Sequence, residues 1–571
     1  MFIRSIGSLL ALLAALSLTG GCKPAATPEK PKPGGPERPK PATPVAETVA
    51  RLHWLGARRL ATETNATYFM GLWSLPESQR LKEQTLDKFA LFLAGVPIPT
   101  FNSVEPLTNF QSLVTNSTLA SSLRPLLGDL LEEEGCLEIR RVPGQPVDLA
   151  LALRLGDERA ALWETNLAAA LGLVAGAHPL PAEAGLRGWQ WSPTNYLSLS
   201  RVADWTVIGL APSPATPLAR DFQVRVQLAH TPFRAAALDL WLEAEFETGP
   251  LAQALGVDWT PPAGWPKVLL ALKGDGLNAR TIGQLNFPQP LAMELEPWTL
   301  PTNYVQGALS SFLSVRGLKP WLESNPAWKR LEAGVAPNQF FSWGLVGVPA
   351  QTTFALPDAS ASNLVSRLTD LALLNNTNLF GASDIARFKR SQTADGLEWK
   401  GLGYLSPFLH SAGTNGDSMV LGGFFPLGAL SSPIPAELFK LLSDTNLVAY
   451  DWDVTGTRIE QLVYIIQFLR FVTHHDQLPG DSAGLKWMRA AAPKLGNCAS
   501  VLNRTGPASF AFIRKSTIGL SAIEMHWLAD WLESPRFPRG LYSLVTPAPP
   551  EYNVPDTNAP APSVPPVAPG R

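Results

Sequence analysis

The amino-acid sequence predicts an α+β fold built from repeated units, in which mixed or antiparallel sheets are covered by helices. The hydrophobic pattern of residues 45–545 changes repeatedly between period two, typical of strands, and period three to four, typical of helices. One order of elements occurs twice, at a spacing of about 205 residues. The chain has 571 residues, 46% of them hydrophobic, which is enough for more than one core.

The first 22 residues have the pattern of an export signal. Arg4 is the only charge before an apolar run from Ile6 to Leu18, and small residues follow up to Cys22. The run is too short to cross a bilayer as a helix. This segment resembles bacterial lipoprotein precursors, in which the Cys after the small residues is acylated and becomes the mature N-terminus. The resemblance implies a lipid on Cys22. The alternative is cleavage nearby, with Cys22 removed or left free.

Two Pro-rich segments flank the body of the chain. Residues 23–44 contain eight Pro, and the last 25 residues contain nine. Such composition favours an extended chain that cannot bury a core. We therefore expect a linker at residues 23–46 and a disordered tail at residues 546–571. In the lipoprotein family, Asp after the acylated Cys favours the inner membrane. Lys23 at that place indicates an outer-membrane anchor facing the periplasm.

The body divides into three predicted α+β units, at residues 47–215, 216–430 and 431–545. The first two share the order strand, Asp-capped helix, Trp-containing strand and hairpin. In the first unit these are a strand at Val147–Leu155, a helix from Asp157, Trp189 and Trp191, and a hairpin of Tyr196–Ser200 with Trp205–Leu210. In the second unit, a strand at Gln351–Leu356 is followed by a helix that begins at Asp358. A strand containing Trp399 comes next, and then a hairpin between Tyr404 and Phe425.

Other elements follow from turn and cap signals. Gly274-Asp275-Gly276 between Lys267–Lys273 and Arg280–Phe287 predicts a hairpin. The pairs Thr64-Asn65 and Thr445-Asn446 predict turns that enter strands at Tyr68–Leu72 and Leu447–Trp452. A capping box of Thr457 with Glu460 predicts the start of a helix that ends at Val472.

The motif Gly480-Asp481-Ser482-Ala483-Gly484 resembles the nucleophile elbow of hormone-sensitive-lipase-type esterases. That chemistry needs a buried strand before the Ser, with an acid and a His downstream. Here a predicted helix and Pro479 precede Ser482, and His526 is the only His that follows. We therefore interpret Ser482 as part of a loop between helices, and a hydrolase using Ser482 remains only an alternative.

Other reactive residue types also have structural interpretations. Asp451-Trp452-Asp453 begins like a calcium loop, but Leu462 stands where that loop needs Glu, so turn and cap chemistry is favoured. His474-His475-Asp476 is interpreted as a solvated helix end. Cys136 and Cys498 can pair in an oxidising compartment, although two separate buried thiols are favoured. The sequence thus predicts no catalytic, cofactor-binding or metal-binding residue.

The composition restricts the function. A net charge of -2 excludes the basic surface of a nucleic-acid-binding protein. Of the 18 Trp, seven lie on predicted strands, and we expect strand and core packing to account for most of the 18. By elimination, we expect an exported, lipid-anchored cell-envelope protein that binds or scaffolds an envelope protein or a glycan. The alternatives are a carrier of an apolar ligand, suggested by the uniformly apolar helix Ile459–Val472, and an enzyme whose site is assembled from scattered residues.

Overall fold

The computed structural model describes most of the chain between residues 46 and 538. The predicted signal segment with Cys22, the linker up to residue 45 and the predicted C-terminal tail lie outside the described residues. The described ranges are 46–95, 110–141, 147–174, 176–181, 186–233, 239–250, 260–261, 263–305, 308–325, 328–329, 335–346, 352–358, 360–368, 389–393, 396–400, 408–413, 418–423, 439–472, 482–534 and 537–538.

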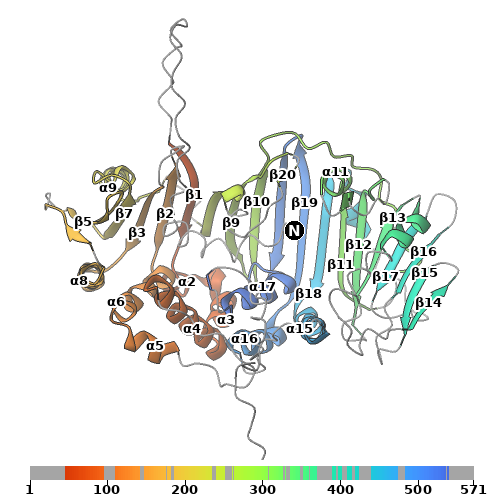
Figure 1. Ribbon diagram of the computed structural model, residues 1–571, viewed down its shortest axis with the longest axis horizontal. Helices are drawn as coiled ribbons and strands as arrows, with labels where there is room; N and C mark the ends of the chain where they lie inside the picture. The colour runs from red at the N-terminus through yellow and green to blue at the C-terminus, as the bar shows by residue number, and fades with distance from the viewer. Residues whose placement is uncertain are drawn as a thin grey trace, which may run out of the picture.

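Within these ranges, twenty strands form one continuous sheet (Figure 1) in which every neighbouring pair is antiparallel. From edge to edge the strands pair in the order β4, β5, β6, β7, β3, β2, β1, β8, β9, β10, β20, β19, β18, β11, β12, β13, β17, β16, β15, β14. Their bounds are β1 Glu47–Trp54, β2 Gly135–Arg141, β3 Asp148–Arg154, β4 His178–Pro179, β5 Leu186–Ser192, β6 Asn195–Val202, β7 Trp205–Ala211, β8 Leu240–Glu247, β9 Lys267–Asp275, β10 Asn278–Asn286, β11 Leu309–Arg316, β12 Gln339–Leu345, β13 Thr352–Pro357, β14 Lys389–Thr393, β15 Gly396–Lys400, β16 Phe408–Ala412, β17 Met419–Gly423, β18 Leu447–Val454, β19 Asn497–Gly506 and β20 Ser509–Ser516.

The sheet consists of two halves with the same topology. Strands β1 to β10 and strands β11 to β20 are arranged in the same order from the outer edge to the centre. A bulge in the β1–β2 pair recurs in the β11–β12 pair, and one in the β8–β9 pair recurs in the β18–β19 pair. Bulges interrupt the ladder at fixed positions, so their recurrence supports a duplication in addition to the shared strand order.

The halves meet at β10 and β20, where Ile282 pairs with Ile513. Each of these residues is the fifth of its strand, and each strand follows a two-residue hairpin loop. Equivalent residues therefore face each other across the central pair. This arrangement places a pseudo-two-fold axis between Ile282 and Ile513.

The predicted α+β fold and its repeat are confirmed. The strands β3 and β13 occupy equivalent places, and each precedes a helix, α8 (Asp157–Gly172) or helical residues 361–368. The residue pairs of β5 with β6 and of β15 with β16 show that Trp189 and Trp399 occupy equivalent positions in the two halves. The hairpins β6–β7 and β9–β10 also form where the sequence predicts them.

Four details differ from the sequence predictions. Asp157, predicted as a helix cap, is the first residue of α8, and Gly156 is the residue at the N-cap position. Tyr68–Leu72 belongs to a helix, α3 (Thr67–Trp73), because a short apolar run fits a helix as well as a strand. The helix predicted from Thr457 begins at Thr455, so Thr457 is not its cap. Finally, the sequence groups residues 216–286 with the second predicted unit, whereas in the sheet β8, β9 and β10 continue directly from β1 in the first half.

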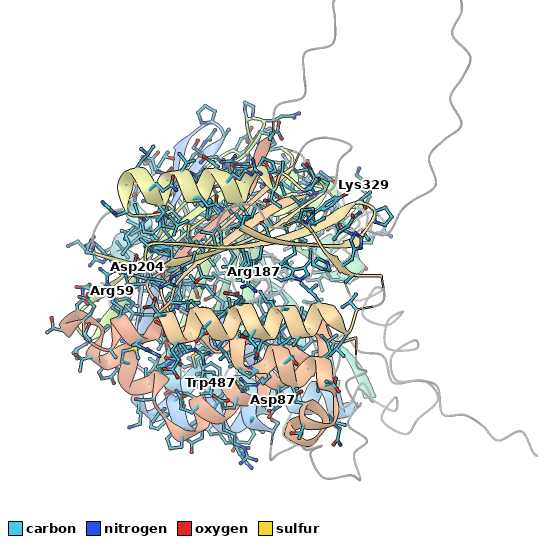
Figure 2. All side chains as sticks on the ribbon, turned by 90° about the vertical axis from the view of Figure 1, so that its left-hand side faces the viewer. Arg59, Asp87, Arg187, Asp204, Lys329 and Trp487 are labelled. Carbon is cyan, nitrogen blue, oxygen red and sulfur yellow. The ribbon has the colours of Figure 1, made fainter. Side chains whose placement is uncertain are left out.

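Helices cover both faces of the sheet. In the first half, α9 (Pro217–Ala229) packs on one face against β3, β6 and β7, while α8 packs on the other face, as Figure 2 shows. We call these the α9 face and the α8 face. Residues that pair directly across neighbouring strands lie on the same face of the sheet. When these pairs are followed from β3 to β20, Ile282 and Ile513 lie on the α9 face.

Most other described helices lie along one side of the sheet (Figure 1). Among them, α15, α16 and α17 share one apolar core, and α4 contacts α16. These helices are α2 Ala57–Leu60, α4 Pro76–Leu93, α5 Phe110–Asn116, α6 Thr118–Leu127, α7 Asp129–Glu132, α15 Thr455–Val472, α16 Ala483–Ala491 and α17 Ala522–Leu532, with α11 Lys319–Ser324 apart from them. On the α9 face of the second half, Val305, Phe439 and Leu442 cover Phe312 and its neighbours.

Candidate functional site

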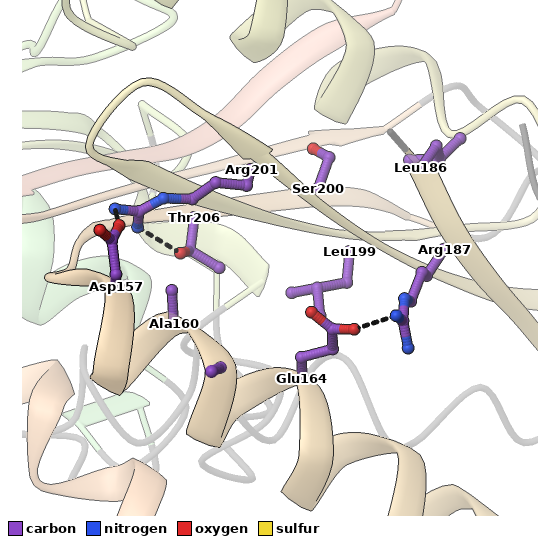
Figure 3. A pocket seen from close by; sticks show the side chains of 10 residues that line it. Asp157, Ala160, Glu164, Leu186, Arg187, Leu199, Ser200, Arg201 and Thr206 are labelled. Carbon is purple, nitrogen blue, oxygen red and sulfur yellow. Dashed lines mark hydrogen bonds and ion pairs between the residues drawn. The ribbon is translucent and has the colours of Figure 1, made fainter. Parts of the chain in front are cut away.

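A groove of about 460 Å³ lies between α8 and the strands β5, β6 and β7 (Figure 3). Two ion pairs connect its walls: Arg201 Nη2 lies 3.1 Å from Asp157 Oδ1, and Arg187 pairs with Glu164. The remaining lining residues are Ala160, Ala161, Leu186, Leu199, Ser200 and Thr206. The groove is therefore small, with a partly apolar lining and matched charges.

The charges of this groove give it little power to recognise a ligand. The Arg187 side chain is 62% exposed and that of Asp157 is fully exposed, so both ion pairs are surface pairs that contribute little. By register, Leu397 and Ser411 stand in the second half where the first has Arg187 and Arg201. The charges are therefore not a requirement of the fold. Every charged residue that lines the groove already has a partner of opposite charge, so none of these charges is left unpaired for a ligand.

A second candidate appears when the two halves are compared on the α8 face. In the first half, Ala244, Phe246, Val268 and Leu270 belong to one buried apolar core. Pairing registers make their counterparts in the second half Asp451, Asp453, Cys498 and Ser500. The same backbone thus carries an apolar core in one half and a polar cluster in the other. Burying polar and charged side chains costs free energy. Because the first half forms the same fold without them, the fold alone does not explain the polar residues of the second half.

The β18 polar cluster, as we call it, joins the sheet to the helices above it. It comprises Asp451, Asp453, Arg458, Ser500, Arg514 and Glu524. Thr455 Oγ1 donates to Asp453 Oδ1 at 2.5 Å, and the amide of Ala522 donates to Asp453 Oδ2 at 3.3 Å. One carboxylate therefore accepts from a hydroxyl at the first residue of α15 and from the first backbone amide of α17, which has no partner within its own helix.

Arg514, which the cluster receives from β20, also has hydrogen-bond and ion-pair partners within the cluster. Arg514 is buried, donates to Ser500 Oγ at 2.8 Å and forms an ion pair with Glu524. Glu524 also accepts from the backbone amide of Ser521 in a capping box at the start of α17. These bonds attach α17 to the sheet and satisfy the buried charges.

Asp451 and Arg458 have fewer partners of opposite charge than Asp453 and Arg514. Burial raises the pKa of Asp451 to about 7, and the neighbouring Asp453 carboxylate adds to the shift. Arg458 donates to Thr352 Oγ1 at 3.3 Å and to Gln461 Oε1 at 3.2 Å, both neutral acceptors. Burial lowers its pKa, although both aspartates oppose that change. Among the described residues, Arg458 has no carboxylate within ion-pair distance.

The structure places Ser482 at a helix start. Its side chain is completely buried, and its Oγ accepts from the amide of Leu485 at 3.2 Å as the N-cap of α16. Gly484 of the same motif packs against α17, where an added Cβ would lie 3.2 Å from Ala529 Cβ and 3.0 Å from Glu533 Cγ. Capping and close helix packing therefore account for this Ser and this Gly, and Ser482 has no exposed nucleophile geometry.

The other residues singled out in the sequence lie apart. Cys136 and Cys498 are both free and buried, as favoured, and burial raises the pKa of each thiol. Cys22 and His474-His475-Asp476 lie outside the described residues. Over the part of the chain that is described, no three His, Cys, Asp or Glu residues are grouped to hold a metal ion. No described helix combines the length and the apolar character needed to cross a membrane.

The α9 face is uncovered at the junction of the halves. Ile282 is 40% exposed and Ile513 is 49% exposed, although both are large apolar residues on a central strand pair. Partly buried Ala271 and Val501 extend this surface onto β9 and β19. We call these four residues the central patch. Beside them, Lys273, Arg280 and Lys515 form a row whose charges pair with Asp239 and Asp275. Farther out, α9 covers β3, β6 and β7 and the core around Phe312 covers the second half, whereas the exposed Glu243 of β8 lies opposite Ala271.

Sequence reasoning assigned the Asp451–Asp453 segment to turn and cap chemistry and missed the cluster and the patch. Two carboxylates at alternate positions of a strand share one face, and this spacing is a signal for a polar site on that face. Ile282 has no comparable signal, because its exposure depends on which helices cover the sheet.

Comparison of this chain with protein-family models, with curated proteins and with solved structures finds no match.

Proposed function

We propose that this chain is an exported, lipid-anchored protein of the bacterial cell envelope, and that it binds or scaffolds a partner on its sheet. The anchor is Cys22, and the partner is an envelope protein or a glycan. The observation that carries the binding role is the central patch, where Ile282 and Ile513 are exposed beside a row of basic side chains that pair with Asp239 and Asp275. Contiguous exposed apolar residues on a soluble domain are typical of interaction sites.

The shape of the fold supports the same role. A continuous sheet of twenty strands in the described residues gives a long, rigid support, which suits holding a partner better than enclosing a small substrate. The groove beside α8 is open and lined by paired charges as well as apolar side chains, and a second pocket at Glu296, Asn338 and Gln339 is polar, so neither is an enclosed apolar cavity. Residues Ile459, Leu462 and Val463 of α15 pack into the core with α16 and α17, so this helix segment does not favour a carrier of apolar ligands.

Two experiments test the proposal. Mass spectrometry of the mature N-terminus should find an acylated Cys22, and Cys22→Ser should release the protein from the membrane fraction. For the binding role, a photo-crosslinking residue at Ile282 or Ile513 should give a specific adduct in the native envelope. The same residue at Leu228, which is 80% exposed on α9, is the matched control. Equal labelling from all three positions would contradict the binding role of the patch. A mature N-terminus at another residue, without a lipid, would contradict only the anchor at Cys22.

A further inference from the structure

One row of the sheet carries a thiol, an imidazole and a carboxylate on neighbouring strands of the α9 face. Cys136 of β2 pairs directly with His53 of β1, and His53 pairs directly with Glu243 of β8. Residues that pair in this way have Cβ atoms about 5 Å apart. In the second half, none of these three groups occurs in the same row, which is formed by Phe341, Ser314 and Tyr450. The fold therefore does not require the thiol, the imidazole or the carboxylate.

The imidazole of His53 has one nitrogen without a partner. His53 is 7% exposed, its ring stacks on that of Phe233 with centroids 3.8 Å apart, and its Nε2 lies 3.2 Å from Glu134 Oε1. Burial opposes ionisation of Glu134, but the bond from His53 and the charge of Arg59 lower its pKa. The ionised Glu134 therefore accepts, and Nε2 carries the proton. In the neutral ring, Nδ1 is then a buried lone pair, and it has no hydrogen-bond partner among the described residues.

The thiol of Cys136 faces this imidazole from the next strand. Cys136 is free, 1% exposed and packed among apolar residues beneath α9. Burial raises the pKa of the thiol, and the charge of Glu138 adds to the shift, so the thiol is neutral on its own. A soft monovalent ion that displaces its proton forms a neutral unit with the thiolate, whereas a divalent ion would leave a net charge in an apolar core. Among soft ions, Cu(I) is the one that thiolate ligands favour in proteins.

We propose that Cys136 Sγ and His53 Nδ1 are the two ligands of a buried Cu(I) site, in which Glu134 orients the imidazole. A carboxylate on the second nitrogen is the usual support of a metal-binding His. Binding releases the thiol proton to solvent, and the copper enters and stays as Cu(I). Over the described part of the chain no three His, Cys, Asp or Glu residues are grouped, so these residues do not offer the four ligands of a structural Zn²⁺ site, whereas two ligands satisfy Cu(I).

Glu243 lies on the solvent side of this pair. It is exposed and forms no ion pair with a described residue, so its charge attracts cations next to His53. The inference does not depend on the proposed function.

Anaerobic titration with Cu(I) in competition with the chelator bicinchoninate tests the site. The protein is the full chain with Cys22→Ser, which leaves Cys136 and Cys498 as its only thiols. It should take one equivalent of Cu(I) from the chelator, and X-ray absorption should show one sulfur and one nitrogen ligand. Cys136→Ser should abolish this binding. Cys498→Ser is the matched control, because Cys498 is also a free, buried thiol on a strand but pairs with Asp453 instead of a His.

The imidazole and the carboxylate behind it have their own variants. Glu134→Gln should weaken Cu(I) binding about tenfold, because the imidazole loses the group that orients it. His53→Gln, which removes the nitrogen ligand itself, should weaken binding more than Glu134→Gln does. Circular dichroism checks that each variant is folded.

No transfer of Cu(I) from the chelator would overturn the inference. Binding that Cys136→Ser or His53→Gln leaves undiminished, or that Cys498→Ser removes, would also overturn it. If the Cys136 and His53 variants do not fold, X-ray absorption of the Cys498→Ser protein decides, since Cys136 is then the only thiol. One sulfur with one nitrogen supports the site, and sulfur without nitrogen, or neither, overturns it.

Discussion

Ile282 and Ile513 lie directly opposite each other in the two central strands, and each is the fifth residue of its strand. The pair marks the axis that relates the two halves of the sheet. Because of this relation, most strand positions have a counterpart with the same backbone pairing. The comparison separates what the fold requires from what one half adds: Ala244 and Phe246 fit where Asp451 and Asp453 also fit, so the charges are an addition.

The first prediction concerns Arg316, a buried residue that donates to four backbone carbonyls. They belong to Glu296, Asp444, Thr445 and Leu447, at 2.7–3.0 Å. Arg316→Met should leave these acceptors without a donor and lower the free energy of unfolding by about 3 kcal/mol. Denaturant unfolding measures this. Arg201→Met, at the rim of the groove, should change it by less than about 0.5 kcal/mol, and equal losses in the two variants would refute the assignment.

The second prediction concerns Ser482. Because its Oγ caps α16, Ser482→Ala should lower the free energy of unfolding by about 1 kcal/mol, and Ser482→Asp should retain part of the cap. A fluorophosphonate probe should not label Ser482 in the folded protein, since the side chain is fully buried. Covalent labelling at Ser482, detected by peptide mass spectrometry, would instead show a nucleophile and revive the hydrolase alternative.

The third prediction concerns Lys88, whose Nζ donates to the carbonyl of Leu532 at 2.8 Å within the helical core. Burial lowers its pKa from 10.5 to about 8, against the opposing attraction of Glu533. The unfolded chain therefore holds this proton more tightly, so the folded state gains stability as the pH rises from about 8 to 10.5.

Lys88→Met has no such proton. The stability of the wild type minus that of Lys88→Met should therefore increase between about pH 8 and about pH 10, as measured by urea unfolding of both proteins. Taking the difference cancels the groups that titrate equally in both. A difference that stays constant over this interval would mean that Lys88 titrates normally.

The sequence predicted the local elements well and their assembly poorly. Alternation and turn residues identify hairpins such as β9–β10, because both strands and the loop are adjacent in the chain. No local signal reports that β10 pairs with β20, since that pairing joins distant segments and rests on the complementarity of whole strands. The grouping of residues 216–286 with a second unit failed to anticipate this continuity.

The candidate site was difficult for the same reason. The sequence assigned the Asp451–Asp453 segment to turn and cap chemistry, and Asp453 accepts from the hydroxyl of Thr455 two residues later. Its second donor, the amide of Ala522, is 69 residues away, and only the folded chain brings it near. Exposure of Ile282 likewise depends on cover provided by other elements.

The last prediction tests whether Asp453 attaches α15 and α17 to the sheet, as its two hydrogen bonds indicate. Asp453→Ala removes the acceptor for Thr455 Oγ1 and for the amide of Ala522, so α15 loses a side-chain bond and α17 loses a backbone bond at its first residue. At about 1 kcal/mol for each lost hydrogen bond, the free energy of unfolding should fall by about 2 kcal/mol, with hydrogen exchange rising first in the opening turns of α15 and α17. Asp453→Asn, which keeps an acceptor oxygen, should lose less.

The matched variant lies in the other half. Phe246→Ala, at the equivalent position, should cost about 3–5 kcal/mol through a cavity in the apolar core, while exchange in α15 and α17 stays as in the wild type below the global transition. The two substitutions thus separate a polar attachment from apolar packing on the same backbone. If Asp453→Phe, which introduces the residue of the first half, proved more stable than the wild type with α17 still protected, the carboxylate would not be what attaches these helices to the sheet.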